Sequence, residues 1–394
     1  MSKQYSVGDV LDVHVEKIVP RGFGLAFAEK LTVLIPLAAP GDELRVVIRE
    51  IKKRLAFAEI VEVLSPGKDR VAPPCQYFGT CGGCDFQQLA YQAQLDAKVA
   101  IIRDSLARIG KIEFANDIPI ISSSPLAYRS RVRWQVDRET RNFGYFKRNS
   151  HEVVNVEACP KLTPELNAVL ASLRNTIDLA TVWSDRLEIQ AVSGGTGDVS
   201  IRSSEGNEPA AEVSWSSGGE TYAFTAETFF QANKLLVPQL IDAAIGGAKG
   251  GTAFDLYSGV GLFTLPLARA FERVIGVEEH AAAAAFAKQN LENAGLTNAK
   301  AVTRSVQSFL ADNRTTNVDL VLLDPPRAGT EKGVIAAIAK LKPKAISYVS
   351  CDPSILARDL RELLDSGYKI ENLTALDLFP QTHHVETVAR LTTK

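Results

Sequence analysis

The chain has 394 residues, of which 46% are hydrophobic and 23% charged, and this profile favours two or three globular domains. No apolar run reaches the roughly 18 residues that a membrane span needs, and residues 1–5 lack the apolar core of a signal peptide, so we expect a cytoplasmic, monomeric protein without membrane partners. The net charge of −2 excludes a chain that binds nucleic acid over its whole surface, so any RNA-binding surface must be local.

The N-terminal segment consists of short strand-like runs separated by turn residues. Residues 9–15 alternate with a period of two, and the segments 20–24 and 40–42 contain the Pro and Gly of turns. Several short strands at this spacing predict a small barrel, of the oligonucleotide-binding type or purely structural. Residues 65–74, rich in Pro and Gly, predict a linker.

Four of the five cysteines have a spacing typical of metal sites. Cys81 and Cys84 form a pair separated by two glycines, Cys75 precedes them, and Cys159 is followed by a proline. A reducing cytosol favours metal binding over disulfides for such a set, and a final Cys-Pro pair recurs in iron–sulfur proteins. Tetrahedral zinc and an iron–sulfur cluster fit the spacing equally well, and either metal could be purely structural.

The region that follows combines an amphipathic helix with a basic strand. Residues 89–109 predict a helix whose apolar face consists of Leu95, Val99, Ile102, Leu106 and Ile109. Residues 163–173 predict a second helix, with Thr163 as its cap and Pro164 at its first position, and residues 181–203 predict strands.

The basic strand is formed by Arg129, Arg131 and Arg133, which alternate with other residues, so a strand would place them on one side. Residues 143–148 mix aromatic and basic side chains. Together these residues suit RNA phosphates and unstacked bases. An ordinary solvated strand face explains the same pattern.

From residue 250 onward the pattern changes to repeated strand–helix units, which predict a parallel, doubly wound sheet. The first strand, 252–256, leads into a turn with Gly259 and Gly261, and the second strand ends at Glu278. Glycines at this turn allow close backbone approach to a nucleoside, and a strand-end acid can accept both ribose hydroxyls. Thr264 occupies the third glycine position of a dinucleotide motif, which favours S-adenosylmethionine over a dinucleotide, with a plain tight turn as the alternative.

Two later strands also end in polar residues. Asp324-Pro325-Pro326-Arg327 follows one, in a pattern typical of methyltransferases that act on nucleobases, although the prolines could simply end the strand. Cys351 follows the other, at the edge where parallel sheets place reacting groups. A buried apolar cysteine is the alternative for Cys351.

These motifs together give the chain a resemblance, nearly from end to end, to the RNA uridine-5-methyltransferases of the iron–sulfur type. The resemblance rests on residues 255–261, residues 324–327, Cys351 and the four grouped cysteines. It implies an α/β protein with a TRAM-like RNA-binding barrel in residues 1–63, a central α+β iron–sulfur domain in residues 64–224, and a Rossmann-like methyltransferase domain in residues 225–394. The helix at 89–109 is expected to pack on the methyltransferase domain.

The resemblance also implies roles for individual residues. It implies a [4Fe-4S] cluster on Cys75, Cys81, Cys84 and Cys159, and contacts of S-adenosylmethionine with Gln231, Tyr257, Glu278 and Asp324. Cys351 would be the nucleophile and Glu386 the base, although without the resemblance Glu386 is better explained as an exposed acid on a strand. Ser258 departs from the family, which often has Cys there, but that position is not a cluster ligand.

The expected activity is methyl transfer from S-adenosylmethionine to C5 of a uridine in tRNA or 23S rRNA, after Cys351 adds to C6 of the base. An RNA cytosine-5-methyltransferase would use the same addition. A cluster-bearing RNA-binding protein without catalysis is a further alternative.

Overall fold

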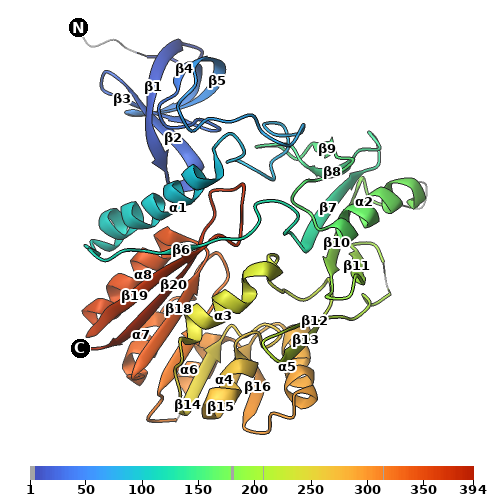
Figure 1. Ribbon diagram of the computed structural model, residues 1–394, viewed down its shortest axis with the longest axis vertical. Coiled ribbons are helices and arrows are strands. Elements are labelled where there is room, and N and C mark those ends of the chain that lie inside the picture. Colours follow the sequence, from blue (N-terminus) through green and yellow to red (C-terminus); the bar gives the residue numbers. More distant parts are fainter. Residues whose placement is uncertain (1–4, 179–181, 207, 314) are drawn as a thin grey trace.

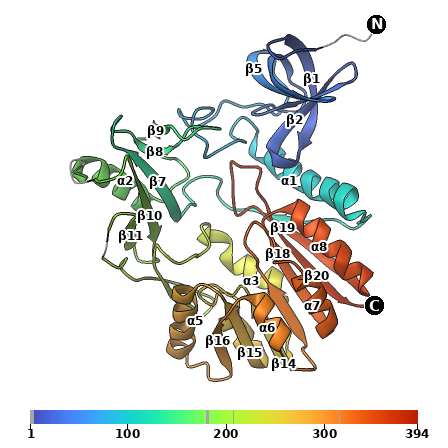
Figure 2. The ribbon, with the colours of Figure 1, turned by 180° about the vertical axis from the view of Figure 1, so that it is seen from behind.

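The computed structural model describes residues 5–178, 182–206, 208–313 and 315–394. Figure 1 shows a small barrel at one end, a large α/β part at the other and a smaller sheet beside them, and Figure 2 shows the same arrangement from behind. Helix α1 (Tyr91–Ser105) lies between the barrel and the large sheet in both views.

The N-terminal strands form a closed barrel in the order β1-β2-β3-β5-β4. Their bounds are β1 (Val10–Val19), β2 (Phe23–Ala28), β3 (Leu31–Ile35), β4 (Glu43–Lys52) and β5 (Leu55–Ser65). Leu11, Val13 and Val15 are buried in the barrel core, as the period of two predicts. The predicted linker is anchored to the barrel, because Arg70 pairs with the buried Asp42 at 2.7 Å.

The chain then crosses to the large sheet. Helix α1 continues into a π-helical turn, Leu106–Gly110, and packs against helix α8 (Pro353–Asp365), while strand β6 (Ile120–Ile121) pairs with strand β19 of the large sheet. The predicted apolar face of the helix is largely correct, but the prediction that Ile109 belongs to it is wrong, since 46% of this residue is exposed. The face also buries Lys98, which the hydrophobic pattern did not indicate.

The smaller sheet has the strand order β11-β10-β7-β8-β9. Its strands are β7 (Arg131–Asp137), β8 (Phe143–Phe146), β9 (Val153–Asn155), β10 (Arg186–Ser193) and β11 (Val199–Ser203), followed by a separate hairpin, β12 (Val213–Ser217) and β13 (Glu220–Phe224). Helix α2 (Pro164–Thr176) packs on this sheet and starts where predicted, but the Thr163 hydroxyl makes no capping hydrogen bond. Thr181, the first residue of the predicted strand region, lies outside the described residues.

The large sheet has the order β16-β15-β14-β17-β18-β20-β19-β6. Its remaining strands are β14 (Gly250–Leu256), β15 (Phe271–Glu278), β16 (Ala299–Thr303), β17 (Leu320–Leu323), β18 (Ala345–Ser350), β19 (Tyr368–Leu376) and β20 (Glu386–Thr393). Strands β14 to β18 are parallel, as the strand–helix repeats predict. Strand β20 reverses the direction and is antiparallel to β18 and β19.

Helices cover both faces of this sheet. Helices α3 (Val237–Ile245), α4 (Thr264–Ala270) and α5 (Ala281–Asn293) share one apolar core, whereas α6 (Val306–Asp312), α7 (Val334–Leu341) and α8 share a second core with α1. The predicted doubly wound architecture is therefore correct. None of the helices in the described residues combines the length and the apolar composition needed to cross a lipid bilayer.

Candidate active site and cysteine pocket

The strand register brings three predicted site residues to one level at the carboxyl edge of the large sheet. Leu256, the last residue of β14, is paired with β15 on one side and with β17 on the other. The next residue along each strand is Tyr257, Glu278 and Asp324, respectively. Parallel sheets place their ligands at this edge, at the point where the strand order reverses, and β14 is such a point here.

The glycine turn after β14 is open to a ligand. Gly259 has φ +55°, and a Cβ atom added there would meet no atom within 4 Å. Gly261 has φ +94°, which favours glycine, and a Cβ there would lie 3.0 Å from the Leu265 side chain of α4. The Gly259 amide donates to Glu278 Oε2 at 2.9 Å and the His280 amide to Oε1 at 2.8 Å, which fixes the carboxylate beside the turn.

Tyr257 is held in an unusual conformation. Its φ is +65°, in the left-handed region, and its hydroxyl donates to Glu331 in the loop after β17. The side chain therefore connects the end of β14 with the loop between β17 and α7.

The loop that carries Gln231 is clamped by an arginine of the smaller sheet. Gln231 is buried, in the segment between β13 and a 3-10 turn at Lys234–Leu236. Arg131 donates to the carbonyl oxygens of Thr228 at 2.6 Å and Ala226 at 2.8 Å. Arg131 therefore fixes this loop. The alternating pattern predicted that Arg131 shares a basic face with Arg129 and Arg133, but its side chain is used for these internal contacts instead. Those two arginines line the cysteine pocket described below.

The end of β18 brings Cys351 next to the start of β20. Ser350, the last residue of β18, pairs with Thr387 of β20 in an antiparallel ladder, and continuing this register by one residue puts Cys351 across from Glu386. Directly opposite residues of such a ladder project from the same face of the sheet. Cys351 is partly exposed, whereas Glu386 is buried and its Oε1 atom has no hydrogen-bond partner among the described residues. Asp352 then caps helix α8 by accepting from the Ser354 amide at 2.8 Å.

Burial and mutual charge shift the pKa values of Cys351, Asp324 and Glu386. Burial raises the pKa of Cys351 to about 12, with further contributions from Glu386 and Asp324, while the Arg327 guanidinium acts in the opposite direction. Burial raises the pKa of Asp324 to about 7, and burial together with Asp324 raises the pKa of Glu386 well above its usual range. The thiol and both carboxyl groups are therefore close enough to sense one another.

A third carboxyl group lies within the same sheet. Asp255 of β14 is fully buried, and burial raises its pKa to about 7, although the Thr264 hydroxyl donates to it at 2.5 Å. Its Oδ1 atom has no partner among the described residues. The negative charges of Asp324 and Glu278 also raise its pKa.

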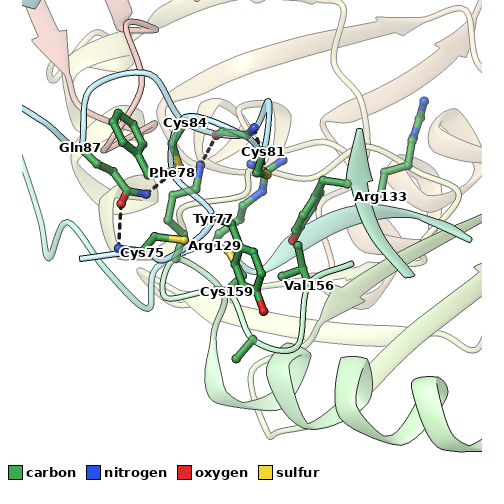
Figure 3. A pocket seen from close by; sticks show the side chains of 14 residues that line it. Cys75, Tyr77, Phe78, Cys81, Cys84, Gln87, Arg129, Arg133, Val156 and Cys159 are labelled. Atoms are coloured by element: carbon green, nitrogen blue, oxygen red, sulfur yellow. Dashed lines mark hydrogen bonds between the residues drawn. The ribbon is translucent and has the colours of Figure 1, made fainter. Parts of the chain in front are cut away.

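The four grouped cysteines line one cavity of about 130 Å³, which Figure 3 shows with its surrounding side chains. Gln87 donates to Cys84 Sγ at 3.0 Å and accepts from the Cys75 amide at 3.2 Å, and the Gly83 amide donates to Cys81 Sγ at 3.4 Å. The buried Lys161 donates to the Gly83 carbonyl at 2.6 Å. Two turns of chain far apart in sequence are thus brought together at this cavity.

The donor set of this pocket fits a thiophilic metal group. Burial raises the pKa of Cys75, and the neighbouring Cys159 and Cys84 raise it further; burial raises the pKa of Cys81 to about 11, with the same two neighbours contributing. Thiolates that repel one another in this way are stabilised by a bound cation. Within the described part of the chain, however, no group of three or more His, Cys, Asp or Glu side chains has a geometry that could hold a metal ion as it stands.

Comparisons with known proteins agree with this geometry. Residues 215–394 match the family model described as tRNA (uracil-5-)-methyltransferase. The chain is 31% identical to an uncharacterized RNA methyltransferase of Thermosynechococcus vestitus over 98% of both chains, and 30% identical to the 23S rRNA (uracil(1939)-C(5))-methyltransferase RlmD of Pectobacterium atrosepticum over 96% of this chain and 93% of that one.

The chain belongs to the RNA uracil-C5-methyltransferase family. The resemblance to the RNA uridine-5-methyltransferases inferred from the sequence motifs is therefore confirmed at the level of the family. Among solved structures, the tRNA (uracil-54, C5)-methyltransferase of Pyrococcus abyssi, in complex with S-adenosyl-L-homocysteine, is 25% identical with a TM-score of 0.74, covering 97% of this chain and 100% of that one. Enzymes of this family depend on S-adenosylmethionine.

Two further residues near this candidate site, Arg327 and His384, were not expected from the sequence motifs to have a role. Burial lowers the pKa of His384 to about 3, so its ring is neutral, and the Arg327 guanidinium lies 3.1 Å from His384 Nδ1. Arg327 belongs to the Asp-Pro-Pro-Arg motif, and His384 precedes the expected base Glu386 by two residues. No sequence pattern indicated that Arg327 and His384 are in contact.

Proposed function

We propose that this methyltransferase transfers a methyl group to C5 of a uridine in structured RNA through a covalent bond between Cys351 Sγ and C6 of the base. The observation that carries the proposal is the position of Cys351 opposite Glu386, at the same sheet edge as the Gly259 turn. A thiol, a buried carboxyl group and an open nucleoside-binding turn are the three parts that this reaction needs.

The chemistry follows from the weak nucleophilicity of uracil C5. Cys351 reacts as the thiolate, which the Arg327 charge favours, and forms a bond to C6 that makes C5 enolate-like. S-adenosylmethionine supplies the electrophilic methyl group when it is bound. Glu386 then accepts the C5 proton, the C6–S bond breaks, and the thiolate is restored. A base with a raised pKa suits this proton transfer near neutral pH.

The methyl donor would bind along the strand ends. Glu278 is placed to accept hydrogen bonds from ribose hydroxyls, since each carboxylate oxygen retains acceptor capacity beyond its backbone contact. Gly259 and Gly261 permit the close approach of the ligand and of α4, respectively. Tyr257, Gln231 and Asp324 are the further proposed contacts of the methyl donor.

The first substrate to test is 23S rRNA. The relative from P. atrosepticum, named for a 23S rRNA uridine, aligns over 96% of this chain, and the same name recurs for a Vibrio parahaemolyticus protein that is 30% identical. Transfer RNA is the second candidate, because the matching family model and the P. abyssi structure are both named for tRNA.

We propose that the barrel assists in holding the RNA. The Lys52 ammonium lies 5.7 Å from the centre of the Phe57 ring, Phe23 packs edge-on to that ring at 5.8 Å, and Phe27 is 47% exposed. A surface that combines aromatic rings with cations suits stacked bases and phosphates.

We further propose that Cys75, Cys81, Cys84 and Cys159 hold a [4Fe-4S] cluster. The shared cavity and the hydrogen bonds to sulfur support this ligand set. Protein purified without oxygen should contain about four iron atoms per chain, and Cys81→Ser should lose them. Cys351→Ser is the matched control and should retain the iron. One zinc atom per chain and no iron would contradict the cluster.

The activity is tested with methyl-labelled S-adenosylmethionine and RNA from cells that lack 5-methyluridine. We expect label in 5-methyluridine from 23S rRNA, with tRNA assayed in parallel. Label in 5-methylcytidine would identify the cytosine enzyme instead. RNA binding without any transfer would support the non-catalytic alternative.

A further inference from the structure

The connection between β19 and β20, residues 377–385, leads directly to Glu386. Although it belongs to the methyltransferase sheet by sequence, most of its polar contacts come from the N-terminal half of the chain. Helix α1 makes one set of contacts, and the loop that carries Cys75, Cys81 and Cys84 makes another. We call residues 377–385 the β19–β20 connection.

Helix α1 holds the start of the β19–β20 connection. The Lys98 ammonium, which is completely buried, pairs with Asp377, and it also donates to the Phe379 carbonyl at 3.1 Å. The Tyr91 hydroxyl donates to the second Asp377 carboxylate oxygen at 2.9 Å. A buried ion pair of this kind fixes its two elements, because moving either partner leaves an uncompensated charge.

The cysteine loop holds the end of the connection. Asp85, which directly follows Cys84, accepts from the His383 amide at 2.8 Å and contacts His383 Nδ1 at 2.5 Å. In return, the amides of Asp85 and Phe86 donate to the Gln381 carbonyl at 3.2 and 3.1 Å. Between these two sets of contacts, Gln94 of α1 and Gln381 exchange two further hydrogen bonds, each 3.1 Å long.

The contacts continue from His383 to the reacting groups. The His383 and His384 rings lie 4.0 Å apart between their centres, and His384 contacts Arg327 at 3.1 Å. Arg327 is the cation whose charge acts on Cys351, and Glu386 begins the strand two residues after His384. A chain of direct contacts therefore runs from the cysteine loop through His383 and His384 to Arg327, while the backbone leads from His384 to Glu386.

We propose that Asp85 and His383 form a positioning pair that docks the cysteine loop on the β19–β20 connection and thereby sets Glu386 and Arg327 against Cys351. The inference rests on the proposed roles of Cys351 and Glu386. It gives the cysteine loop a function in catalysis that needs no contact between a metal and the substrate. Helix α1, through Lys98 and Asp377, supports the same segment from its other end.

The first test compares Asp85→Ala, His383→Ala and the double variant with the unmodified enzyme. We expect kcat to fall by roughly ten- to hundredfold in each single variant, since small displacements of catalytic groups have effects of this size, while KM for S-adenosylmethionine changes less than about twofold. The double variant should be no worse than either single variant, because both remove the same contact. Glu43→Gln is the matched control, since it breaks a similar pair with His14, 2.7 Å long, on the barrel surface.

A second measurement is independent of methyl transfer. Hydrogen exchange of peptides covering residues 377–386, measured without RNA or methyl donor, should be faster in both single variants and unchanged in Glu43→Gln. Loss of transfer in the unmodified enzyme would reject the proposed function but leave this measurement valid. If the Asp85→Ala variant loses its metal or does not fold, the His383→Ala variant alone tests the positioning role. His383, unlike Asp85, is distant from the cysteines in sequence. An unchanged kcat and unchanged exchange in His383→Ala would overturn the positioning role.

Discussion

Cys351 and Glu386 each lie one residue beyond the Ser350–Thr387 pair that ends an antiparallel ladder, although they are 35 residues apart in sequence. The arrangement depends on the reversal of β20 within an otherwise parallel run of strands, because a sixth parallel strand would have placed its amino end at the far edge of the sheet. The reversal brings the first residue of β20 beside the residue that follows β18. One thiol and one buried carboxyl group thereby come together at the carboxyl edge of the parallel strands.

The first prediction concerns Glu386→Gln. The substituted amide cannot accept the C5 proton, so a covalent RNA–protein intermediate should form and then fail to resolve. We expect turnover to fall by roughly 10²–10⁴-fold, the usual contribution of a general base, and a slowly migrating RNA adduct on a denaturing gel. The absence of an adduct, with turnover close to that of the unmodified enzyme, would contradict the role of Glu386.

The second prediction concerns the reactivity of Cys351 towards iodoacetamide. Burial and the nearby negative charges raise the pKa of this thiol to about 12, so its alkylation should be slow at pH 8 and accelerate up to the highest pH at which the protein is stable. Since alkylation requires the thiolate, Arg327→Ala should slow the reaction at pH 9.5 and Glu386→Gln should accelerate it, each by roughly tenfold per unit of pKa change.

The rate is followed by mass spectrometry of the peptide that contains Cys351, which separates it from the four other cysteines. Lys344→Ala serves as a control, because that exposed cation pairs with Asp319 at the opposite end of β18. Equal alkylation rates in all variants would show that these charges do not act on the thiol.

The third prediction concerns the pH dependence of stability. An unfolded aspartate ionises near pH 4, whereas burial raises the pKa of Asp255 in the fold to about 7. The folded state therefore binds more protons than the unfolded state between these values, so the contribution of Asp255 to stability is present below about pH 4 and is lost as the pH rises to about 7. Asp255→Asn should flatten the fall in Tm between pH 5 and 7. The same dependence of Tm on pH in Asp255→Asn and in the unmodified protein would contradict the raised pKa of Asp255.

The fourth prediction concerns the arginine clamp. Arg131→Met keeps most of the side-chain volume but leaves the carbonyl oxygens of Thr228 and Ala226 without their donor. We expect the free energy of unfolding in urea to fall by about 1–3 kcal/mol and the affinity for S-adenosylmethionine to weaken, since the loop carries Gln231. Arg49→Met, which removes an exposed ion pair with Glu59, should change the stability by less than about 1 kcal/mol. Equal losses of stability in Arg131→Met and Arg49→Met would contradict the proposal that Arg131 fixes the loop.

Much of the candidate site could be predicted from local sequence pattern, because at each strand end a polar residue or glycine follows an apolar run. Gly259, Glu278, Asp324 and Cys351 all follow short apolar runs, and parallel pairing brings such positions to one edge. The barrel was equally accessible, since its alternating residues are buried as the period of two requires.

The features that pattern could not predict depend on long-range contacts. Glu386 looks like an exposed strand acid until β20 is known to be antiparallel and central in the sheet. Lys98 looks solvated, yet Asp377 neutralises it in the core. Arg131 alternates with Arg133 like a phosphate-binding residue, but its partners are carbonyl groups almost 100 residues away. Each case pairs a charge with a group that no local window contains.

The covalent role of Cys351 is tested with RNA in which the target uridine carries fluorine at C5. Glu386 can remove a proton from C5 but has no means of removing fluorine as a cation, so the intermediate should persist with its C6–S bond intact. Mass spectrometry of the digested complex should then find the methylated nucleotide attached to Cys351. A nucleotide attached to a different residue, or 5-methyluridine formation by Cys351→Ala, would contradict the account.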